Sequence, residues 1–150
     1  MKILNPAQNF GKSIEMAITS MLLAENREVY LPAVDDHGVD LIVRTKDCDL
    51  TLPDSAARHY EFQEIQVKSL NKGGLFAAFN LLPRPNYWFV FYVRQHNTIW
   101  LINSIELAKI GSQNSPSCKN AGKWSVSLAT NNGPSPNKTQ YIITDFTPLP

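Results

Sequence analysis

The segment YEFQEIQVKS, residues 60–69, carries polar side chains at alternate positions: Glu64, Gln66 and Lys68. Ile65 and Val67 lie between them. Side chains two residues apart share one face of a strand, so the pattern predicts a strand that its apolar residues anchor in the core. The three polar groups would then project together from a rigid element, which suits chemistry that needs a constant geometry.

Two acidic residues elsewhere can join this group. Asp40 opens VDLIVR, whose continuous apolar centre predicts a buried strand. Glu15 lies in residues 9–25, where apolar side chains recur at the spacing of a helix with one buried face. If the strands of Asp40 and Gln66 are antiparallel neighbours, one end of the pair presents a carboxylate, an amide oxygen and the Lys68 ammonium, with Glu15 above them.

These groups suit a hard divalent cation. Mg²⁺ prefers oxygen ligands, keeps several waters and takes few protein carboxylates. We therefore expect Mg²⁺, or Mn²⁺ in its place, to be bound by Glu15, Asp40, Gln66 and the backbone carbonyl of Val67. The ion would polarise a phosphodiester and activate a bound water, and Lys68 would orient that water or offset charge on the phosphorus.

The same residues resemble the PD-(D/E)XK nuclease superfamily, which has the restriction-endonuclease-like fold. The resemblance covers residues 9–111 and rests on helical Glu15, GVDLIV with Asp40, and IQVKS with Gln66 and Lys68, followed by an aromatic strand and a helix. It implies an α/β core with a mixed sheet flanked by helices. It also implies that the four named residues are catalytic, and the Gln-x-Lys variant resembles a bacterial intron-encoded homing endonuclease.

The function that this resemblance implies is metal-dependent hydrolysis of double-stranded DNA by activated water. One such site cuts one strand, so a double-strand cut predicts a homodimer or a higher homo-oligomer. Gln66 removes one negative charge from the metal site, which leaves open a catalytically decayed nucleic-acid-binding protein of the same fold. A second alternative is an unrelated protein-interaction module, in which Glu15, Asp40, Gln66 and Lys68 would lie far apart.

Other candidate residues fit this chemistry less well. Pro53-Asp54 spells "PD", but no apolar run follows it, so Asp40 is preferred over Asp54. Glu64 shares a strand face with Gln66 and either supplies the missing charge or is a surface residue. The histidines at positions 37, 59 and 96 are scattered along the chain and predict no histidine-based site.

The length of 150 residues predicts one domain over residues 1–150. The composition, with 43% hydrophobic and 18% charged residues, is that of a globular protein and argues against disorder. We expect a nuclease-like core at about 9–111 and a Ser/Asn/Pro-rich C-terminal extension at 112–150. No apolar run is long enough for a membrane span, and no signal pattern opens the chain, so we expect no membrane partner and a cytoplasmic protein. The net charge of +1 predicts no strong general attraction to polyanions.

The remaining elements follow from local patterns. Residues 86–94 and 98–102 predict buried strands, and Ser104 would cap a helix that Gly111 ends. GLFAAFNLL, residues 74–82, predicts a short turn or helix. WSVSL and YIITDF predict two short terminal strands or an extended arm.

Overall fold

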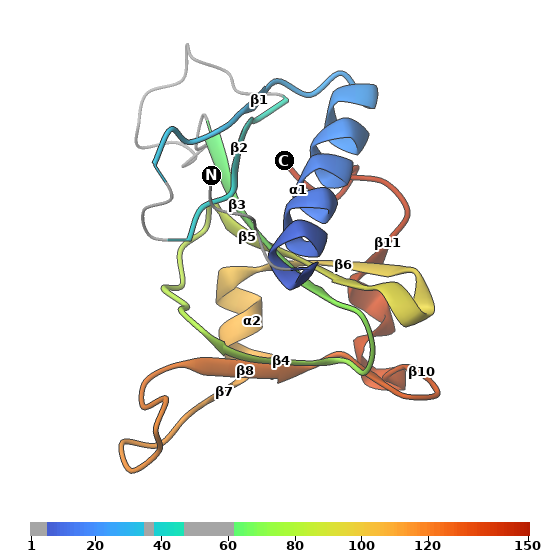
Figure 1. Cartoon of the computed structure of the whole chain (residues 1–150). Coiled ribbons are helices and arrows are strands. Elements are labelled where there is room, and N and C mark those ends of the chain that lie inside the picture. Colours follow the sequence, from blue (N-terminus) through green and yellow to red (C-terminus); the bar gives the residue numbers. More distant parts are fainter. Residues whose placement is uncertain (1–5, 35–37, 47–61) are drawn as a thin grey trace.

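The computed structural model describes residues 6–34, 38–46 and 62–150. Its main sheet is six-stranded, in the order β1-β2-β3-β5-β6-β11 (Figure 1). β3 and β5 are parallel, whereas the other neighbours are antiparallel, so the sheet is mixed. The strands are β1 (Val29–Tyr30), β2 (Leu41–Arg44), β3 (Phe62–Leu70), β5 (Tyr87–Val93), β6 (Thr98–Asn103) and β11 (Ile142–Ile143).

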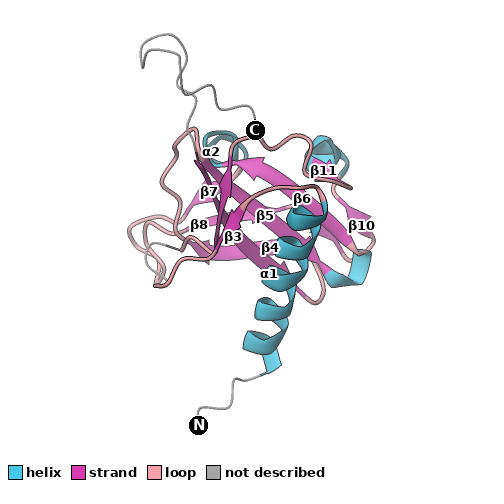
Figure 2. Ribbon diagram, turned by 90° about the horizontal axis from the view of Figure 1, so that it is seen from above, coloured by secondary structure: helices cyan, strands magenta, loops and turns pink. Residues whose placement is uncertain are grey.

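Helix α1 (Pro6–Ala24) covers one face of this sheet, and Figure 2 shows it lying across the strands. Its buried residues Ile18 and Leu22 share a core cluster with Ile65 and Val67 of β3. The helix predicted for residues 9–25 is therefore confirmed, although it begins several residues earlier than expected. Pro6 explains the early start, because its fixed φ and missing N–H suit the first turn of a helix.

The opposite face is covered by α2 (Ser104–Ile110) and by a second, three-stranded sheet, as Figure 1 shows. This second sheet has the order β4-β8-β7, from β4 (Leu75–Phe79), β8 (Trp124–Ser127) and β7 (Ser112–Gln113). The predicted α/β class with a mixed sheet flanked by helices is thus confirmed. Short elements complete the chain: η1 (Arg94–His96), β9 (Ala129–Thr130), β10 (Gly133–Pro134) and η2 (Pro136–Tyr141).

Strand β5 lies between the two layers and is buried on both faces. Phe89 and Phe91 pack toward the second sheet, while Val90 packs with α1, and all three side chains are fully buried. A strand covered on both faces needs apolar residues at every position, which explains its uninterrupted hydrophobic run.

The prediction of a turn or helix at residues 74–82 is wrong, because Leu75–Phe79 form β4. Phe76 and Phe79 are three residues apart, as on a helix face, yet both are buried in the core. The register of β4 against β8 shifts between them, and Ala78 has a φ of 59°. This bulge adds one residue and turns both rings inward, so the helical spacing comes from an irregular strand.

The cap of α2 also differs from expectation. Asn103 is the N-cap, and its side-chain oxygen accepts a hydrogen bond from the backbone N–H of Ile105 at 3.0 Å. Ser104, the expected cap, is fully buried, and its hydroxyl binds the backbone of Arg84 instead. Gly111 ends the helix as predicted. The hydrogen bonds of Ser104 to the Arg84 backbone therefore connect α2 with the loop before β5.

The C-terminal residues take part in the core. Phe146 and Leu149 are almost completely buried against α1 and β3. β8 and β11 confirm the two short strands expected beyond residue 112. In the described residues, no helix has both the length and the apolar character for a membrane span, and the cytoplasmic location stays a prediction.

Candidate functional site

Asp40 lies directly before β2 and is tied to β3 by both its backbone and its side chain. Its N–H donates to the carbonyl of Ile65 at 2.9 Å, and its Oδ2 accepts from the N–H of Val67 at 2.7 Å. β2 and β3 are antiparallel with Leu41 opposite Ile65, as the sequence argument required. In this antiparallel register, Asp40, the residue before Leu41, lies opposite Gln66, the residue after Ile65.

The backbone carbonyl of Val67 is a second oxygen near the Asp40 carboxylate. Val67's side chain belongs to the core cluster under α1, but its N–H points to Asp40. The N–H and C=O of one strand residue project toward the same neighbouring strand. The Val67 carbonyl therefore lies on the edge of β3 that faces Asp40, beyond the start of β2.

Gln66 is buried, with 6% of its surface exposed, and its amide lies on the face of β3 opposite α1. Its Oε1 accepts a hydrogen bond from the hydroxyl of Tyr87 at 3.1 Å. On the other side the amide meets Gly38, where an added Cβ would lie 2.4 Å from Nε2. The amide is thus held between a hydroxyl and a glycine backbone.

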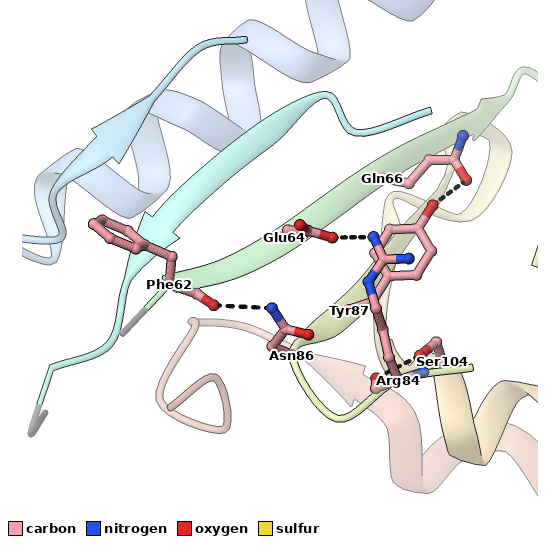
Figure 3. A network of polar contacts seen from close by, with 7 residues as sticks. All are labelled: Phe62, Glu64, Gln66, Arg84, Asn86, Tyr87 and Ser104. Atoms are coloured by element: carbon pink, nitrogen blue, oxygen red, sulfur yellow. Dashed lines mark hydrogen bonds and ion pairs between the residues drawn. The ribbon is translucent and has the colours of Figure 1, made fainter. Parts of the chain in front are cut away.

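Tyr87 is in turn held by Arg84 (Figure 3). The Arg84 guanidinium lies over the Tyr87 ring, 4.3 Å from its centroid, and forms an ion pair with Glu64. The N–H of Tyr87 donates to the Arg84 carbonyl, and the hydroxyl of Ser104 binds both the N–H and the carbonyl of Arg84. Glu64 is therefore engaged by Arg84, not turned toward Asp40 as a substitute ligand.

Burial raises the pKa of Tyr87 to about 12, against an opposing effect of the Arg84 charge. The negative charges of Asp40 and Glu64 raise this pKa further, by less than burial does. Tyr87 therefore keeps its proton at neutral pH and can donate it to Gln66.

Glu15 and Asp40 line the same cavity of about 490 Å³, between α1 and the chain that leads into β2. Glu15 is 21% exposed and forms an ion pair with Lys12 at 2.6 Å. The described residues that line this cavity do not include Gln66 or Lys68. Asp40 lines this cavity and also binds the backbone of Val67, the residue next to Gln66.

Lys68 follows Gln66 by two residues on β3, so it occupies the same face of the strand. It is half-buried and makes no hydrogen bond or ion pair with any residue in the described part of the chain. Within the described residues, no hydrogen bond or ion pair therefore holds the Lys68 ammonium in place.

The oxygen donors suit Mg²⁺. Asp40 and Glu15 provide carboxylates at one cavity, and the carbonyl of Val67 adds a neutral oxygen nearby. In residues 6–34, 38–46 and 62–150, no three His, Cys, Asp or Glu side chains form a metal-binding group. Mg²⁺ does not require such a group, because waters and phosphate oxygens complete its shell.

The other sequence candidates lie apart from this arrangement. Asp54, His37 and His59 fall outside the described residues. His96 lies in η1, where its Nε2 contacts the carbonyl of Thr130 at 2.8 Å. Sequence reasoning missed Tyr87 and Arg84. Tyr87 begins an aromatic strand whose sequence is typical of a buried core strand. Its position opposite Glu64 in the parallel pair β3–β5 cannot be predicted from neighbouring residues in the sequence.

No protein-family model matches the sequence, and no curated protein matches it. Among solved structures, the chain is similar to I-Ssp6803I, a bacterial homing endonuclease. The likeness covers 92% of this chain and 89% of that chain, with a TM-score of 0.57 and 14% sequence identity. At this identity the likeness shows the fold alone, which this chain shares with that endonuclease.

Proposed function

We propose that the protein is a metal-dependent DNA endonuclease of the PD-(D/E)XK type. The observation that carries the proposal is the junction of β2 and β3, where the Asp40 carboxylate binds the backbone of Val67 beside Gln66. The similarity to a bacterial homing endonuclease over 92% of the chain supports the same function. DNA as the substrate and a divalent cation as the cofactor are parts of this proposal.

Each residue receives a role from its position. Asp40, Glu15, the Val67 carbonyl and the Gln66 amide oxygen are the proposed ligands of Mg²⁺ or Mn²⁺. When bound, such an ion lowers the pKa of a water and stabilises charge on the phosphate. Lys68, two positions beyond Gln66 on the same strand face, orients the attacking water and offsets the charge that develops on phosphorus.

Double-strand cleavage would need two copies of this site. We therefore propose that the active species on double-stranded DNA is a homodimer or a higher homo-oligomer. Sedimentation of the protein with DNA tests this part. A monomer on DNA that nonetheless makes double-strand cuts would refute it.

A catalytically decayed DNA-binding protein is the second candidate, and Gln66 favours it. The amide brings no charge, and its Oε1 already accepts a hydrogen bond from Tyr87. The protein-interaction module predicted that Glu15, Asp40, Gln66 and Lys68 lie far apart. It is less supported, because Asp40 and Gln66 are neighbours across β2 and β3, and Glu15 lines a cavity with Asp40.

The test is cleavage of supercoiled plasmid by the purified protein with Mg²⁺, with Mn²⁺ and with a chelator. We expect nicked and linear DNA only with a divalent cation. Lys68→Ala should reduce the rate by about 100-fold or more, since positioned proton-transfer groups contribute roughly that much.

Lys72→Ala is the matched control, because Lys72 is an exposed lysine just beyond the same strand. It should cleave like the wild type. Full cleavage by Lys68→Ala would remove Lys68 from the mechanism. Calorimetric titration with Mn²⁺ separates the two candidates: absence of binding, even with DNA present, would favour the decayed protein.

A further inference from the structure

We propose that the hairpin between β7 and β8, residues 114–123, is a DNA-binding element that contacts the phosphate backbone beside the cleavage site. The inference rests on the proposed function, since it identifies the surface on which double-stranded DNA lies. The hairpin is outside the group of residues that the sequence pattern brings together. Its charge, its rigidity and its position next to the candidate site together indicate this role.

Charge is unevenly distributed along the chain, although the net charge is only +1. Residues 1–64 contain six lysines and arginines and eleven acidic residues, whereas residues 65–144 contain eight and one. The single acidic residue of the second part, Glu106, is paired with Lys109 at 3.1 Å. This second part includes β5, β6, α2 and the whole second sheet. DNA is a dense polyanion, so it is attracted to this part of the molecule.

The hairpin projects from the second sheet, beyond the ends of β7 and β8 (Figure 1). It contains Lys119 and Lys123 and no acidic residue. Lys119 is exposed and makes no hydrogen bond or ion pair with any residue in residues 6–34, 38–46 and 62–150. Its ammonium can therefore bind a phosphate without breaking a contact in this part of the protein.

Hydrogen bonds within the hairpin stabilise its conformation. The N–H of Asn114 donates to the carbonyl of Lys123 at 2.8 Å, and the Asn114 side chain donates to the carbonyl of Asn120 at 3.1 Å. The Lys123 ammonium donates to Asn80 in the loop before β5, and Trp124 at the base packs against the core. A preorganised element loses little conformational entropy on binding, so it contributes more affinity than a flexible loop of the same charge.

The hairpin lies next to the candidate site. A cavity of about 440 Å³ is lined in part by Gly122 of the hairpin and by Arg84 and Tyr87 at the start of β5. Tyr87 also binds the side chain of Gln66, as Figure 3 shows. The hairpin, this cavity and Gln66 therefore follow one another on the side of the main sheet opposite α1. Lys68 occupies the same strand face as Gln66, so a duplex whose scissile phosphate lies at Lys68 has the hairpin beside it.

The first experiment measures DNA binding by the metal-free protein, because contacts between Lys119 and phosphates need no divalent cation. The affinity for a fluorescein-labelled DNA duplex is determined in EDTA over a series of salt concentrations. Lys119→Gln should weaken binding by about 5- to 10-fold at about 0.1 M salt, since one contact that releases counterions is lost. The slope of log K against log salt should fall in magnitude by about 1.

Lys46→Gln is the matched control, because it removes the same charge from the part of the chain that is rich in acidic residues. Lys46 is exposed just beyond the end of β2 and lines a cavity with Arg27 and Glu28, not with the hairpin. Lys46→Gln should bind the duplex with the affinity and the salt slope of the wild type.

A second readout locates the contact. Cys118 is an exposed thiol of the hairpin, next to Lys119. A photoreactive reagent can be attached there once Cys48→Ser has removed the other cysteine. We expect crosslinks from position 118 to the duplex on illumination. The same reagent attached through Lys46→Cys, in a background of Cys48→Ser and Cys118→Ser, should give none.

The outcomes separate this inference from the proposed function. Wild-type affinity and salt slope in Lys119→Gln, or the absence of crosslinks from position 118, overturns the inference, while cation-dependent cleavage by the wild type upholds the nuclease. Weaker binding by Lys119→Gln together with crosslinks from position 118, in a protein that cleaves no DNA, upholds the role of the hairpin and overturns the nuclease. A wild type that binds no duplex even at low salt overturns both.

Discussion

Position 66 shows how one atom type would change the proposed metal site. The Gln66 amide occupies a buried place beside Asp40, where a carboxylate of nearly the same shape would add a negative charge. A neutral amide avoids the repulsion that two neighbouring carboxylates would have. It also accepts the hydrogen bond of the Tyr87 hydroxyl without the free-energy cost of burying a charge. The cost would be a weaker attraction to the proposed cation.

This comparison predicts the behaviour of Gln66→Glu. Burial and the nearby Asp40 charge should raise the pKa of the new carboxyl group, so it stays neutral at low pH and ionises as the pH rises or as Mn²⁺ binds. We expect Mn²⁺ affinity close to that of the wild type at acidic pH and about 10- to 100-fold tighter at alkaline pH. Calorimetric titration at two pH values measures both.

The control for this prediction is Gln63→Glu, a buried glutamine on the opposite face of β3 that binds Thr45 and the indole of Trp88. Its substitution should leave the pH dependence of Mn²⁺ binding as in the wild type. Weaker binding by Gln66→Glu at alkaline pH would show that Oε1 does not face the cation.

At the scale of elements, the connection into β2 depends on Gly38. This residue has a φ of +73°, which a residue with a side chain adopts only with strain, and it also packs against the Gln66 amide. A glycine at position 38 allows both the left-handed turn and the close contact with the Gln66 side chain. The segment before Asp40 can therefore pack against β3.

Gly38→Ala and Gly73→Ala separate these two contributions. Gly73 has nearly the same φ of +74°, but no atom lies within 4 Å of its Cβ position. Both variants should lose about 1–2 kcal/mol of unfolding free energy from the left-handed backbone. Only Gly38→Ala should also displace Gln66 and weaken Mn²⁺ binding, by about tenfold or more.

Urea unfolding and Mn²⁺ titration on both variants provide the measurements. Equal Mn²⁺ affinity in the two would mean that the packing of Gly38 against the amide has no part in the site. A greater loss of stability in Gly73→Ala than in Gly38→Ala would contradict the strain argument itself.

In the whole molecule, Arg27 connects the end of α1 with the C-terminal segment. It is 4% exposed, and its guanidinium donates to the carbonyls of Phe146, Leu149 and Pro150. The carboxylate of Glu25 accepts from the N–H of Phe146 at 2.8 Å. These contacts hold Phe146 and Leu149 in the core under α1.

Arg27→Ala should therefore destabilise the fold by about 3 kcal/mol, since hydrogen bonds to charged groups contribute more than neutral ones and the carbonyls lose their partner. Arg44→Ala is the control. Its ion pair with Glu28 spans 3.4 Å between exposed side chains, so we expect a loss below about 1 kcal/mol. Denaturant unfolding measures both, and similar losses would contradict a structural role for Arg27.

Prediction from sequence succeeded where the pattern is local. The apolar spacing of residues 9–25 specifies a helix, and the alternation around Gln66 places Ile65 and Val67 against α1. It failed at β4, where the bulge at Ala78 gives a strand the spacing of a helix. The C-terminal segment was also ambiguous, because its contacts with Arg27 join distant parts of the chain.

By itself the sequence determined the elements that carry Glu15, Asp40, Gln66 and Lys68, and the common strand face of the last two, because helix and strand periods depend only on neighbouring residues. Only the tertiary structure decided that Tyr87 binds the Gln66 amide and that Arg84 engages Glu64. Both contacts require the parallel pairing of β3 with β5. Parallel neighbours need a long crossover connection, which here passes through β4 of the second sheet, so the pairing joins residues that no local pattern relates.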